Sequence, residues 1–443
     1  MTTTASSNPL KDIERIFALQ KKNQWKMKNT TAAERIELLE KMKGALENHR
    51  EELDEALYQD LGRPKTSSEI NGVLKKIKNA ADRLEEWMKP VVHSHPHIQS
   101  ASYYVQYEPR GVVLLFGAWN VPVDLIFSPL IAILAAGNTA IAKPSELTPK
   151  TSALIASIIR STFNEDTVAV VEGDANLAIE LQKLPFDHIF VTGSPNVGRM
   201  VMGAAAKHLT SVTLELGGRN PLILDETADF KALAQGIGIG KTYNSGQICL
   251  AVNHVFAPKS KVDELVQALS GFYTSLYYEN GVYQASKVGR IVDARNFDRI
   301  VGDLEGTIKL GAKVAFGGAC DRDALTIEPT VLTDVPADSP LVRNEIFAPI
   351  TPIIAYEDIQ DAIDHINSGG KPLGMYVFSK NQSFIDRILG HTSCGGVTIN
   401  GWALHGGEDD LPFGGVGESG MGSYHGIHGF LELSHAKPVF KTF

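Results

Sequence analysis

The sequence predicts an α/β protein whose sheets are mainly parallel. Short apolar runs alternate with helical stretches through the middle of the chain, and this alternation is typical of βαβ units. The runs are residues 112–116, 168–171, 188–192, 212–216, 222–224 and 255–257. The alternation resumes with a helix from about Lys261, a strand at 352–356, a helix at 359–367 and a strand at 375–378. Because 443 residues exceed one compact core, we expect two or three domains.

Residues 10–90 predict a helical beginning to the chain. Thr31 and Glu34 have the spacing of a capping box that opens one helix, and Gly62 closes this helical stretch. A second amphipathic helix follows and ends before Pro90.

The segment after these helices changes in character. Residues 91–102 are polar and predict an extended linker, which leads into an exposed strand at 103–108. His93, His95 and His97 alternate in the linker, and this spacing can bind a metal. No carboxylate or cysteine joins them, so we expect no metal site.

Composition and charge favour small-molecule partners. The formal net charge of −9 is spread along the chain, which argues against nucleic acid because binding it needs a basic face. The three cysteines, at 249, 320 and 394, are too few for a disulfide framework and fit a reducing compartment. Residues 1–9 have no apolar core of a secretory signal, so we expect a frayed end and a cytoplasmic protein.

One apolar run, residues 111–142, has the length of a membrane span and a single charge, Asp124. Prolines, asparagines and a glycine interrupt it at short intervals. This pattern favours a buried strand, a turn, a helix and a second strand, and we expect no membrane span.

Cys249 lies in the small polar stretch Asn-Ser-Gly-Gln-Ile-Cys-Leu at 244–250. A thiol in such a turn can be a nucleophile. Only the thiolate attacks carbon, and a free cysteine with a pKa near ~8.5 needs a dipole or cation nearby to ionise at neutral pH. The alternative is that Cys249 is a small buried hydrophobe.

Two further residues offer catalytic chemistry. Glu215 ends an apolar strand among apolar neighbours, where desolvation would raise its pKa and make it a competent base. Asn120 lies beside Trp119 next to a tight turn, and its amide can stabilise an oxyanion. Each has a structural alternative: Glu215 pairs with a cation, Asn120 caps a helix and Trp119 packs in the core.

Two strand ends offer groups that bind ribose or phosphate. Lys143 and Glu146 follow an apolar strand and could hold ribose hydroxyls, or they form a solvated pair in a turn. Ser194 and Pro195 open a helix directly after a strand, and such a helix N-terminus can receive a phosphate. The spacing there is not Gly-x-Gly-x-x-Gly, so the usual dinucleotide fingerprint is absent.

Taken together, these motifs resemble those of the aldehyde dehydrogenase superfamily, over nearly the whole chain. The matching motifs are Trp119-Asn120-x-Pro122, Lys143-Pro-Ser-Glu146, Thr192-Gly193-Ser194, Leu214-Glu215-Leu-Gly-Gly218, Asn244-Ser-Gly-Gln-Ile-Cys249, Glu345-Ile-Phe347 and Leu411-Pro-Phe-Gly-Gly415. The short N-terminus, the Lys-Pro-Ser-Glu motif and the ending Gly-Met-Gly-Ser-Tyr-His-Gly at 420–426 resemble the class 3 branch. That branch includes fatty, aromatic and coniferyl aldehyde dehydrogenases.

The resemblance implies a Rossmann-like cofactor domain, a second α/β catalytic domain and a small β bridging element used to form a homodimer. The NAD(P)-binding domain would comprise residues 1–98 and 109–214 with part of 396–426, the catalytic domain 215–395, and the bridging element 99–108 and 427–443.

The resemblance also implies NAD(P)+-dependent oxidation of a medium- or long-chain aliphatic or aromatic aldehyde to the acid, through a cysteine thiohemiacetal and a thioester. Cys249 would be the nucleophile, Glu215 the base, and Asn120 with the Cys249 backbone N–H the oxyanion hole. Glu345 could act as the base instead. The cofactor would be bound by Trp119, Lys143, Ser145, Glu146, Gly193, Ser194, Val197, Gly217, Glu345 and Phe347. We expect backbone dipoles and the cationic nicotinamide to favour the thiolate.

Glu146 would repel the 2′-phosphate of NADP, which favours NAD, although class 3 enzymes often accept both. Val121, Ala348 and Trp402 depart from the family pattern without removing a catalytic group. Val121 could widen the substrate entry while Trp402 refills it, and Ala348 could shift Phe347. Two other functions stay open: a catalytically retired homologue with a binding or structural role, and a thiol-dependent esterase.

Overall fold

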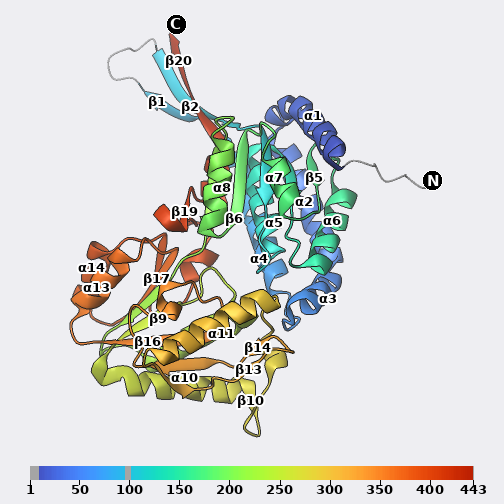
Figure 1. Cartoon of the computed structure of the whole chain (residues 1–443). Coiled ribbons are helices and arrows are strands. Elements are labelled where there is room, and N and C mark those ends of the chain that lie inside the picture. The colour runs from blue at the N-terminus through green and yellow to red at the C-terminus, as the bar shows by residue number, and fades with distance from the viewer. Residues whose placement is uncertain (1–8, 95–100, 443) are drawn as a thin grey trace.

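The computed structural model describes residues 9–94 and 101–442, which form two α/β lobes and a small projecting sheet (Figure 1). The frayed end that we expect at residues 1–8 lies outside this part of the chain. One lobe contains a six-stranded sheet and the other a seven-stranded sheet. Most strand pairs in both sheets are parallel, so the predicted α/β class is confirmed.

Helices open the described chain, as predicted. They are α1 (Pro9–Lys28), α2 (Ala32–Asn48), α3 (Arg50–Leu61) and α4 (Ser68–Trp87). The Thr31 hydroxyl accepts the Glu34 N–H and the Glu34 carboxylate accepts the Thr31 N–H, so the capping box is confirmed. Gly62 has a φ of +66°, a conformation that costs glycine little, and α3 ends there.

The six-stranded sheet has the order β19-β7-β6-β3-β4-β5. Its strands are β3 (Val112–Phe116), β4 (Thr139–Lys143), β5 (Val168–Val170), β6 (His188–Gly193), β7 (Ser211–Leu216) and β19 (Gly420–Met421). The helices between them are α5 (Asp124–Ala136), α6 (Pro149–Thr162), α7 (Ala175–Leu181) and α8 (Pro195–Ala205). Side chains of α2, α4, α5 and α6 cover one face of the sheet, and those of α1, α7 and α8 cover the other.

The long apolar run forms β3, α5 and β4, as its interruptions predicted. α5 is only 13 residues long, and every residue from 125 to 136 is buried in the core. Across residues 9–94 and 101–442, no helix is long and apolar enough to cross a membrane.

The seven-stranded sheet has the order β12-β15-β16-β9-β8-β17-β18. Its strands are β8 (Pro221–Leu224), β9 (His254–Pro258), β12 (Lys313–Phe316), β15 (Thr330–Thr333), β16 (Ile350–Tyr356), β17 (Gly374–Phe378) and β18 (Gly396–Ile399). Its helices are α9 (Phe230–Thr242), α10 (Val262–Tyr277), α11 (Ala294–Lys309), α12 (Pro340–Arg343), α13 (Ile359–Ser368) and α14 (Gln382–His391).

Short elements complete this lobe and its connections. The two hairpins are β10 (Tyr278–Glu279) with β11 (Val282–Tyr283), and β13 (Cys320–Asp321) with β14 (Thr326–Ile327). The 3₁₀ turns are η1 (Tyr243–Gly246), η2 (Lys259–Lys261), η3 (Ala285–Lys287), η4 (Leu404–Gly407) and η5 (Gly417–Ser419).

The projecting sheet consists of β1 (Val91–Ser94), β2 (Ala101–Pro109) and β20 (Ser434–Thr442) (Figure 1). The linker predicted from residue 91 is therefore wrong for residues 91–94, which pair with β2. The strand is only four residues long and is followed by a polar segment, so the sequence alone does not reveal its pairing with β2.

The C-terminal residues divide between the sheets differently from the predicted domain ranges. Residues 427–432 belong to α15 (Gly426–Glu432), which packs on α4 and α5, so only β20 extends the projecting sheet. β18 joins the seven-stranded sheet, whereas β19 joins β7 in the six-stranded sheet.

Candidate active site

One cavity of about 1490 Å³ lies where β3, β4, β6 and β7 end, with walls from both lobes. The carboxyl ends of parallel strands are where α/β sheets bind ligands. Every candidate residue from the sequence lines this cavity: Trp119, Asn120, Lys143, Ser145, Glu146, Gly193, Ser194, Val197, Glu215, Gly217, Cys249, Glu345 and Phe347. The structure therefore brings them together, and the role of each is proposed below.

Cys249 follows a turn in which three consecutive residues have left-handed backbone. The φ values are +50° at Asn244, +54° at Ser245 and +71° at Gly246. A Cβ on Gly246 would lie 2.6 Å from the carbonyl oxygen of Ala348, so the close approach requires glycine. Such a backbone persists only where its surroundings hold it in place.

Two buried amides hold this turn. Gln247 Nε2 donates to the carbonyl oxygen of Asn244 at 2.9 Å. Asn220 Nδ2 donates to the carbonyl oxygens of Cys249 at 2.6 Å and Ala251 at 3.0 Å. Sequence reasoning missed Asn220, although a polar residue between the Leu-Gly-Gly motif and an apolar strand is a signal that could have found it.

Asn120 is buried and its side chain points toward the same turn. Its Nδ2 donates to the backbone carbonyl oxygen of Gln247 at 3.1 Å, and the backbone carbonyl oxygen of Asn120 accepts Asn244 Nδ2 at 2.7 Å. A side-chain amide nitrogen carries two hydrogens, so the bond to Gln247 leaves one for a ligand in the cavity. The position suits an oxyanion donor.

Two carboxylates line the cavity in different environments. Neither oxygen of Glu215 has a hydrogen-bond partner within the described part of the chain, and burial, with the nearby Glu432, raises its pKa well above the ordinary range. Burial also raises the pKa of Glu345, to about 7, against the opposing effects of the Gly218 N–H, 3.1 Å away, and of Arg299. The raised pKa of each group favours its protonated form and makes its deprotonated form a stronger base.

The Cys249 thiol is protonated at neutral pH in the ligand-free protein. Burial and, to a lesser extent, the charges of Glu345, Glu215 and Asp124 raise its pKa to about 12, against the opposing effect of the Leu250 N–H. The Leu250 N–H is thus an example of the expected backbone dipole, but its effect on the pKa of Cys249 is smaller than that of burial and the nearby carboxylates. The expectation that a cationic nicotinamide favours the thiolate stays a prediction.

The cavity fits a dinucleotide at two strand ends. Lys143, although buried, keeps its ammonium 2.9 Å from a Glu146 carboxylate oxygen, which places a cation and an anion beside each other for ribose hydroxyls. The Ser194 hydroxyl caps α8 by accepting the Val197 N–H at 3.4 Å. The N-terminus of α8, where the helix dipole is positive, suits a pyrophosphate.

The other end of the cavity is shaped by Phe347 and Glu345. Phe347 has a φ of +54°, and its ring meets Trp119 edge-to-face with 5.8 Å between centroids. A side chain on Gly217 would overlap the Glu345 carboxylate, so the strand end must carry glycine there.

Sequence reasoning also missed the residues that hold this segment. Arg299 donates to the carbonyl oxygens of Glu345 at 3.3 Å and Ile346 at 3.1 Å. Asn253 accepts the Ile346 N–H at 2.9 Å. Tyr424, from the glycine-rich end, also lines the cavity; burial and the nearby Asp124, Glu215 and Cys249 raise its pKa well above the ordinary range.

Two of the residues that depart from the family pattern, Trp402 and Ala348, have well-defined packing or hydrogen bonds. Trp402 Nε1 donates to the carbonyl oxygen of Leu250, the residue after Cys249, at 2.9 Å. Ala348 is fully buried. Trp402 and Val121 are not among the residues that line the cavity, so their effect on the substrate entry stays a prediction.

The histidines considered as metal ligands are only partly described. His93 lies in β1, with its ring stacked on Tyr103 at 5.5 Å between centroids. His95 and His97 lie outside the described residues. The expectation of no metal site stays a prediction.

The fold, and a cavity at the carboxyl ends of its parallel strands, suit an enzyme that binds a nucleotide. The aldehyde dehydrogenase family model matches residues 1–439. AldX of Bacillus subtilis (strain 168), which carries the name of an aldehyde dehydrogenase, is 45% identical over 433 residues, 97% of each chain. Aldehyde dehydrogenase family 3 member A2 of Macaca fascicularis is 39% identical over 409 residues, covering 91% of this chain and 83% of that protein.

A solved structure agrees with these relatives. The substrate-bound state of Staphylococcus aureus AldH has a TM-score of 0.93 and 38% identity, over 97% of this chain and 94% of that one. The chain therefore belongs to the aldehyde dehydrogenase family, and the resemblance to its class 3 branch is confirmed. It is an enzyme that oxidises aldehydes to acids with NAD or NADP.

Proposed function

We propose that Cys249 is the nucleophile of this oxidation and that the acyl group passes through a thiohemiacetal and a thioester on its sulfur. The observation that carries the proposal is that the thiol of Cys249, the amide of Asn120 and the carboxylates of Glu215 and Glu345 line one cavity. Thiol, donor and base are the parts that acyl chemistry at an aldehyde carbon requires.

The thiolate of Cys249 attacks the carbonyl carbon and gives a tetrahedral oxyanion. The Asn120 amide and the Cys249 backbone N–H donate to that oxyanion. When bound, the nicotinamide ring supplies the hydride acceptor. Glu215 then takes a proton from water, the water oxygen attacks the thioester, and the acid leaves as Cys249 recovers its thiolate.

Glu345 is the second candidate for the base. It is held by the Gly218 N–H, and its pKa of about 7 lies where a base works best at neutral pH. We assign the hydrolytic step to Glu215 because its carboxylate is free of hydrogen bonds within the described chain and can turn toward the thioester.

Replacing Asn120 with alanine should lower kcat about 10²- to 10³-fold, because one oxyanion donor is lost. The KM for the aldehyde should change much less, since the donor acts mainly in the transition state. Steady-state kinetics measure both. Asn164→Ala, an exposed asparagine in another part of the lobe, serves as the control. A fall in substrate affinity with unchanged kcat would show that Asn120 binds the ground state only.

The substrate we propose is a medium- or long-chain aliphatic or an aromatic aldehyde. Apolar side chains on the cavity wall support this class; they include Trp119, Leu125, Phe347, Phe413 and Tyr424. Absorbance of the reduced cofactor, followed over a series of aldehydes, tests it. Absence of cofactor reduction with every aldehyde would favour a retired homologue, and ester cleavage without it would favour an esterase.

The cofactor we propose is NAD, with NADP as a weaker alternative. The Glu146 side chain is 42% exposed and pairs with Lys143 beside the expected ribose position, where its charge opposes a 2′-phosphate. Glu146→Gln should therefore tighten NADP+ binding relative to NAD+ by roughly 3- to 10-fold, which corresponds to about 0.6–1.4 kcal/mol. Dissociation constants from protein fluorescence measure this ratio. Glu172→Gln is a control outside the cavity, and an equal shift in that variant would contradict the prediction.

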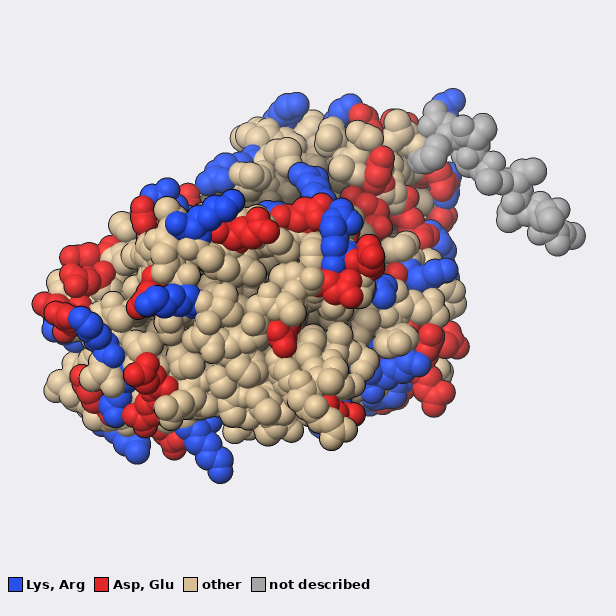
Figure 2. Space-filling view, turned by 60° about the horizontal axis from the view of Figure 1, so that its bottom comes forward, with Lys and Arg blue, Asp and Glu red and all other residues tan. Residues whose placement is uncertain are grey.

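We also propose that the chain forms a homodimer. The projecting sheet exposes Val92 and Phe440, and Ile399 is exposed on β18 at the edge of the seven-stranded sheet. Figure 2 shows a broad face with very few charged side chains, seen with the lower side of Figure 1 forward. In the lobe with the seven-stranded sheet, residues 265–278, which lie in α10 and at the start of β10, carry no charge. Light scattering should then report about twice the chain mass of 48.1 kDa.

A cytoplasmic location fits the cysteines. Cys249, Cys320 and Cys394 are all unpaired, and the Cys320 thiol is exposed. Exposed free thiols persist in reducing compartments. Cell fractionation of the native protein tests this part of the proposal.

A further inference from the structure

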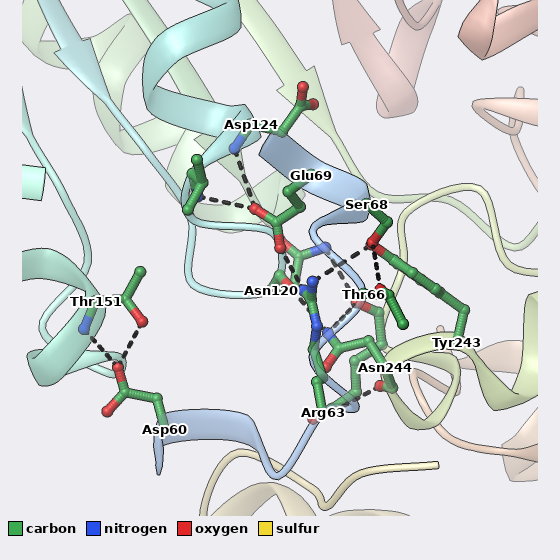
Figure 3. A network of polar contacts seen from close by, with 12 residues as sticks. Asp60, Arg63, Thr66, Ser68, Glu69, Asn120, Asp124, Thr151, Tyr243 and Asn244 are labelled. Carbon is green, nitrogen blue, oxygen red and sulfur yellow. Dashed lines mark hydrogen bonds and ion pairs between the residues drawn. The ribbon is translucent and has the colours of Figure 1, made fainter. Parts of the chain in front are cut away.

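A buried ion pair lies between the segments that carry Asn120 and Cys249, and the mechanism above does not use it. Arg63 lies in the turn between α3 and α4, Glu69 lies in the first turn of α4, and each is 5% exposed. An Arg63 guanidinium nitrogen is paired with one carboxylate oxygen of Glu69. Figure 3 shows the pair with its neighbours on both sides.

Glu69 holds the beginning of α5. Its second oxygen accepts the backbone N–H groups of Val123 at 2.9 Å and Asp124 at 3.1 Å. Val123 has no side chain that could cap the helix, so Glu69 supplies the cap from a different helix. Val123 comes three residues after Asn120. The carboxylate therefore fixes the end of the turn in which Asn120 lies.

Arg63 holds the beginning of the turn before Cys249. Its second terminal nitrogen donates to the Tyr243 hydroxyl at 3.4 Å, and its guanidinium lies over the Tyr243 ring at 5.2 Å from the centroid. The Ser68 hydroxyl lies 2.9 Å from the same Tyr243 oxygen (Figure 3). Tyr243 directly precedes Asn244, the first of the left-handed residues.

The two held segments are joined to each other at the site. Asn244 Nδ2 donates to the Asn120 carbonyl, and Asn120 Nδ2 donates to the Gln247 carbonyl. A displacement of either segment thus moves the amide relative to the thiol. A misplacement of about 1 Å from a distant mutation can cost on the order of 10²-fold in rate.

Stability alone does not explain a pair at this depth. Removing two charges from water is costly, and well-packed apolar residues in the same place are often as stable or more stable. What an apolar pair cannot do is cap the N–H groups of Val123 and Asp124 and bind the Tyr243 hydroxyl at the same time. We propose that Arg63 and Glu69 are positioning residues, which fix the distance between the Asn120 amide and the Cys249 turn for the oxyanion. This rests on the proposed roles of Asn120 and Cys249.

A double-mutant cycle tests whether the pair acts through Asn120. Glu69→Gln keeps the shape of the side chain and removes its charge, and Tyr243→Phe removes only the hydroxyl at the other end. In the wild-type background, Glu69→Gln should lower kcat about 10- to 100-fold with KM for the aldehyde within about threefold. In an Asn120→Ala background the same change should cost less than about threefold, because the amide it positions is gone. Losses that multiply in full would overturn the proposal.

Asp187→Asn is the matched control. Asp187 is a partly buried carboxylate of the same lobe that also pairs with a cation, Lys21, and accepts a backbone N–H, that of Val112 at 2.7 Å. We expect it to lower the unfolding temperature with kcat within about twofold of the wild type, as for a purely structural pair. If Glu69→Gln and Tyr243→Phe behave in the same way, the pair is structural and the proposal is wrong.

Alkylation of Cys249 gives a readout that needs neither cofactor nor turnover. The rate with iodoacetamide in the ligand-free protein should differ from the wild type by threefold or more in Glu69→Gln and Tyr243→Phe, and by less than twofold in Asp187→Asn. Equal rates in all four proteins would overturn the positioning role. If the wild type oxidises no aldehyde, the proposed catalytic roles are wrong. The alkylation rate of Cys249 still tests whether Arg63 and Glu69 position the turn before Cys249.

Discussion

Aldehyde-dependent formation of the reduced cofactor should fall by a factor on the order of 10⁴ or more when Cys249 is replaced by alanine, as for other covalent nucleophiles. Cys249 is the cysteine that lines the cavity, whereas Cys320 lies in β13 and Cys394 lies just before β18. The oxyanion donor and the carboxylates remain in the variant, but no sulfur is left to hold the acyl group. Absorbance at the wavelength of the reduced cofactor measures the loss.

The control for this experiment is Cys394→Ala, which removes a half-buried thiol outside the cavity. It should retain activity within about twofold, since substitutions away from the site have small effects. If activity survives in Cys249→Ala and disappears in Cys394→Ala, the assignment of the nucleophile to Cys249 is wrong. Cofactor binding, measured separately, shows whether the Cys249→Ala variant is folded.

Replacing Glu215 with glutamine should slow turnover about 10²- to 10⁴-fold, the range for the loss of a general base. Hydride transfer precedes the hydrolytic step, so the first turnover should remain fast. Stopped-flow absorbance should then show a burst of about one equivalent of reduced cofactor per site, followed by a slow phase. The wild type should show a smaller burst or none.

Glu345→Gln separates the two carboxylates. If Glu345 were the base, its loss would slow the hydrolytic step, and the wild-type rate of that step would rise with pH through about 7 and then level off, because only the deprotonated form accepts a proton. The Glu215 assignment predicts that the pH dependence of this step is kept in Glu345→Gln and lost in Glu215→Gln, because the group that titrates is then Glu215, whose pKa burial raises. A burst that persists in Glu345→Gln and vanishes in Glu215→Gln would contradict our assignment.

Much of the fold could be predicted because its signals are local. The Thr31–Glu34 capping box and Gly62 mark helix boundaries within a few residues of sequence. β1 could not be predicted, because residues 91–94 form a strand only by pairing with β2. α15 was assigned to the projecting element for a similar reason, since its packing on α5 is a contact over nearly 300 residues of sequence.

The residues of the candidate site likewise include some that the sequence predicts and some that it does not. Asn120, Lys143, Ser194 and Glu215 each follow or end a buried strand, and parallel strands end at one edge, so the sequence predicted that they would meet. The residues that hold the site carry no such signal. Arg299 and the pair of Arg63 and Glu69 act through tertiary contacts to backbone groups, and no spacing in the sequence reveals those contacts.

The thioester on Cys249 is the central claim, and mass measurement of the trapped intermediate tests it most directly. Glu215→Gln protein, mixed with NAD+ and an aldehyde and quenched in acid within the burst, is digested, and the Cys249 peptide is weighed. We predict a gain equal to the mass of the aldehyde less two hydrogen atoms, because an acyl group replaces the thiol hydrogen after hydride transfer. An unmodified Cys249 peptide, or the acyl group on a different residue, would contradict the account.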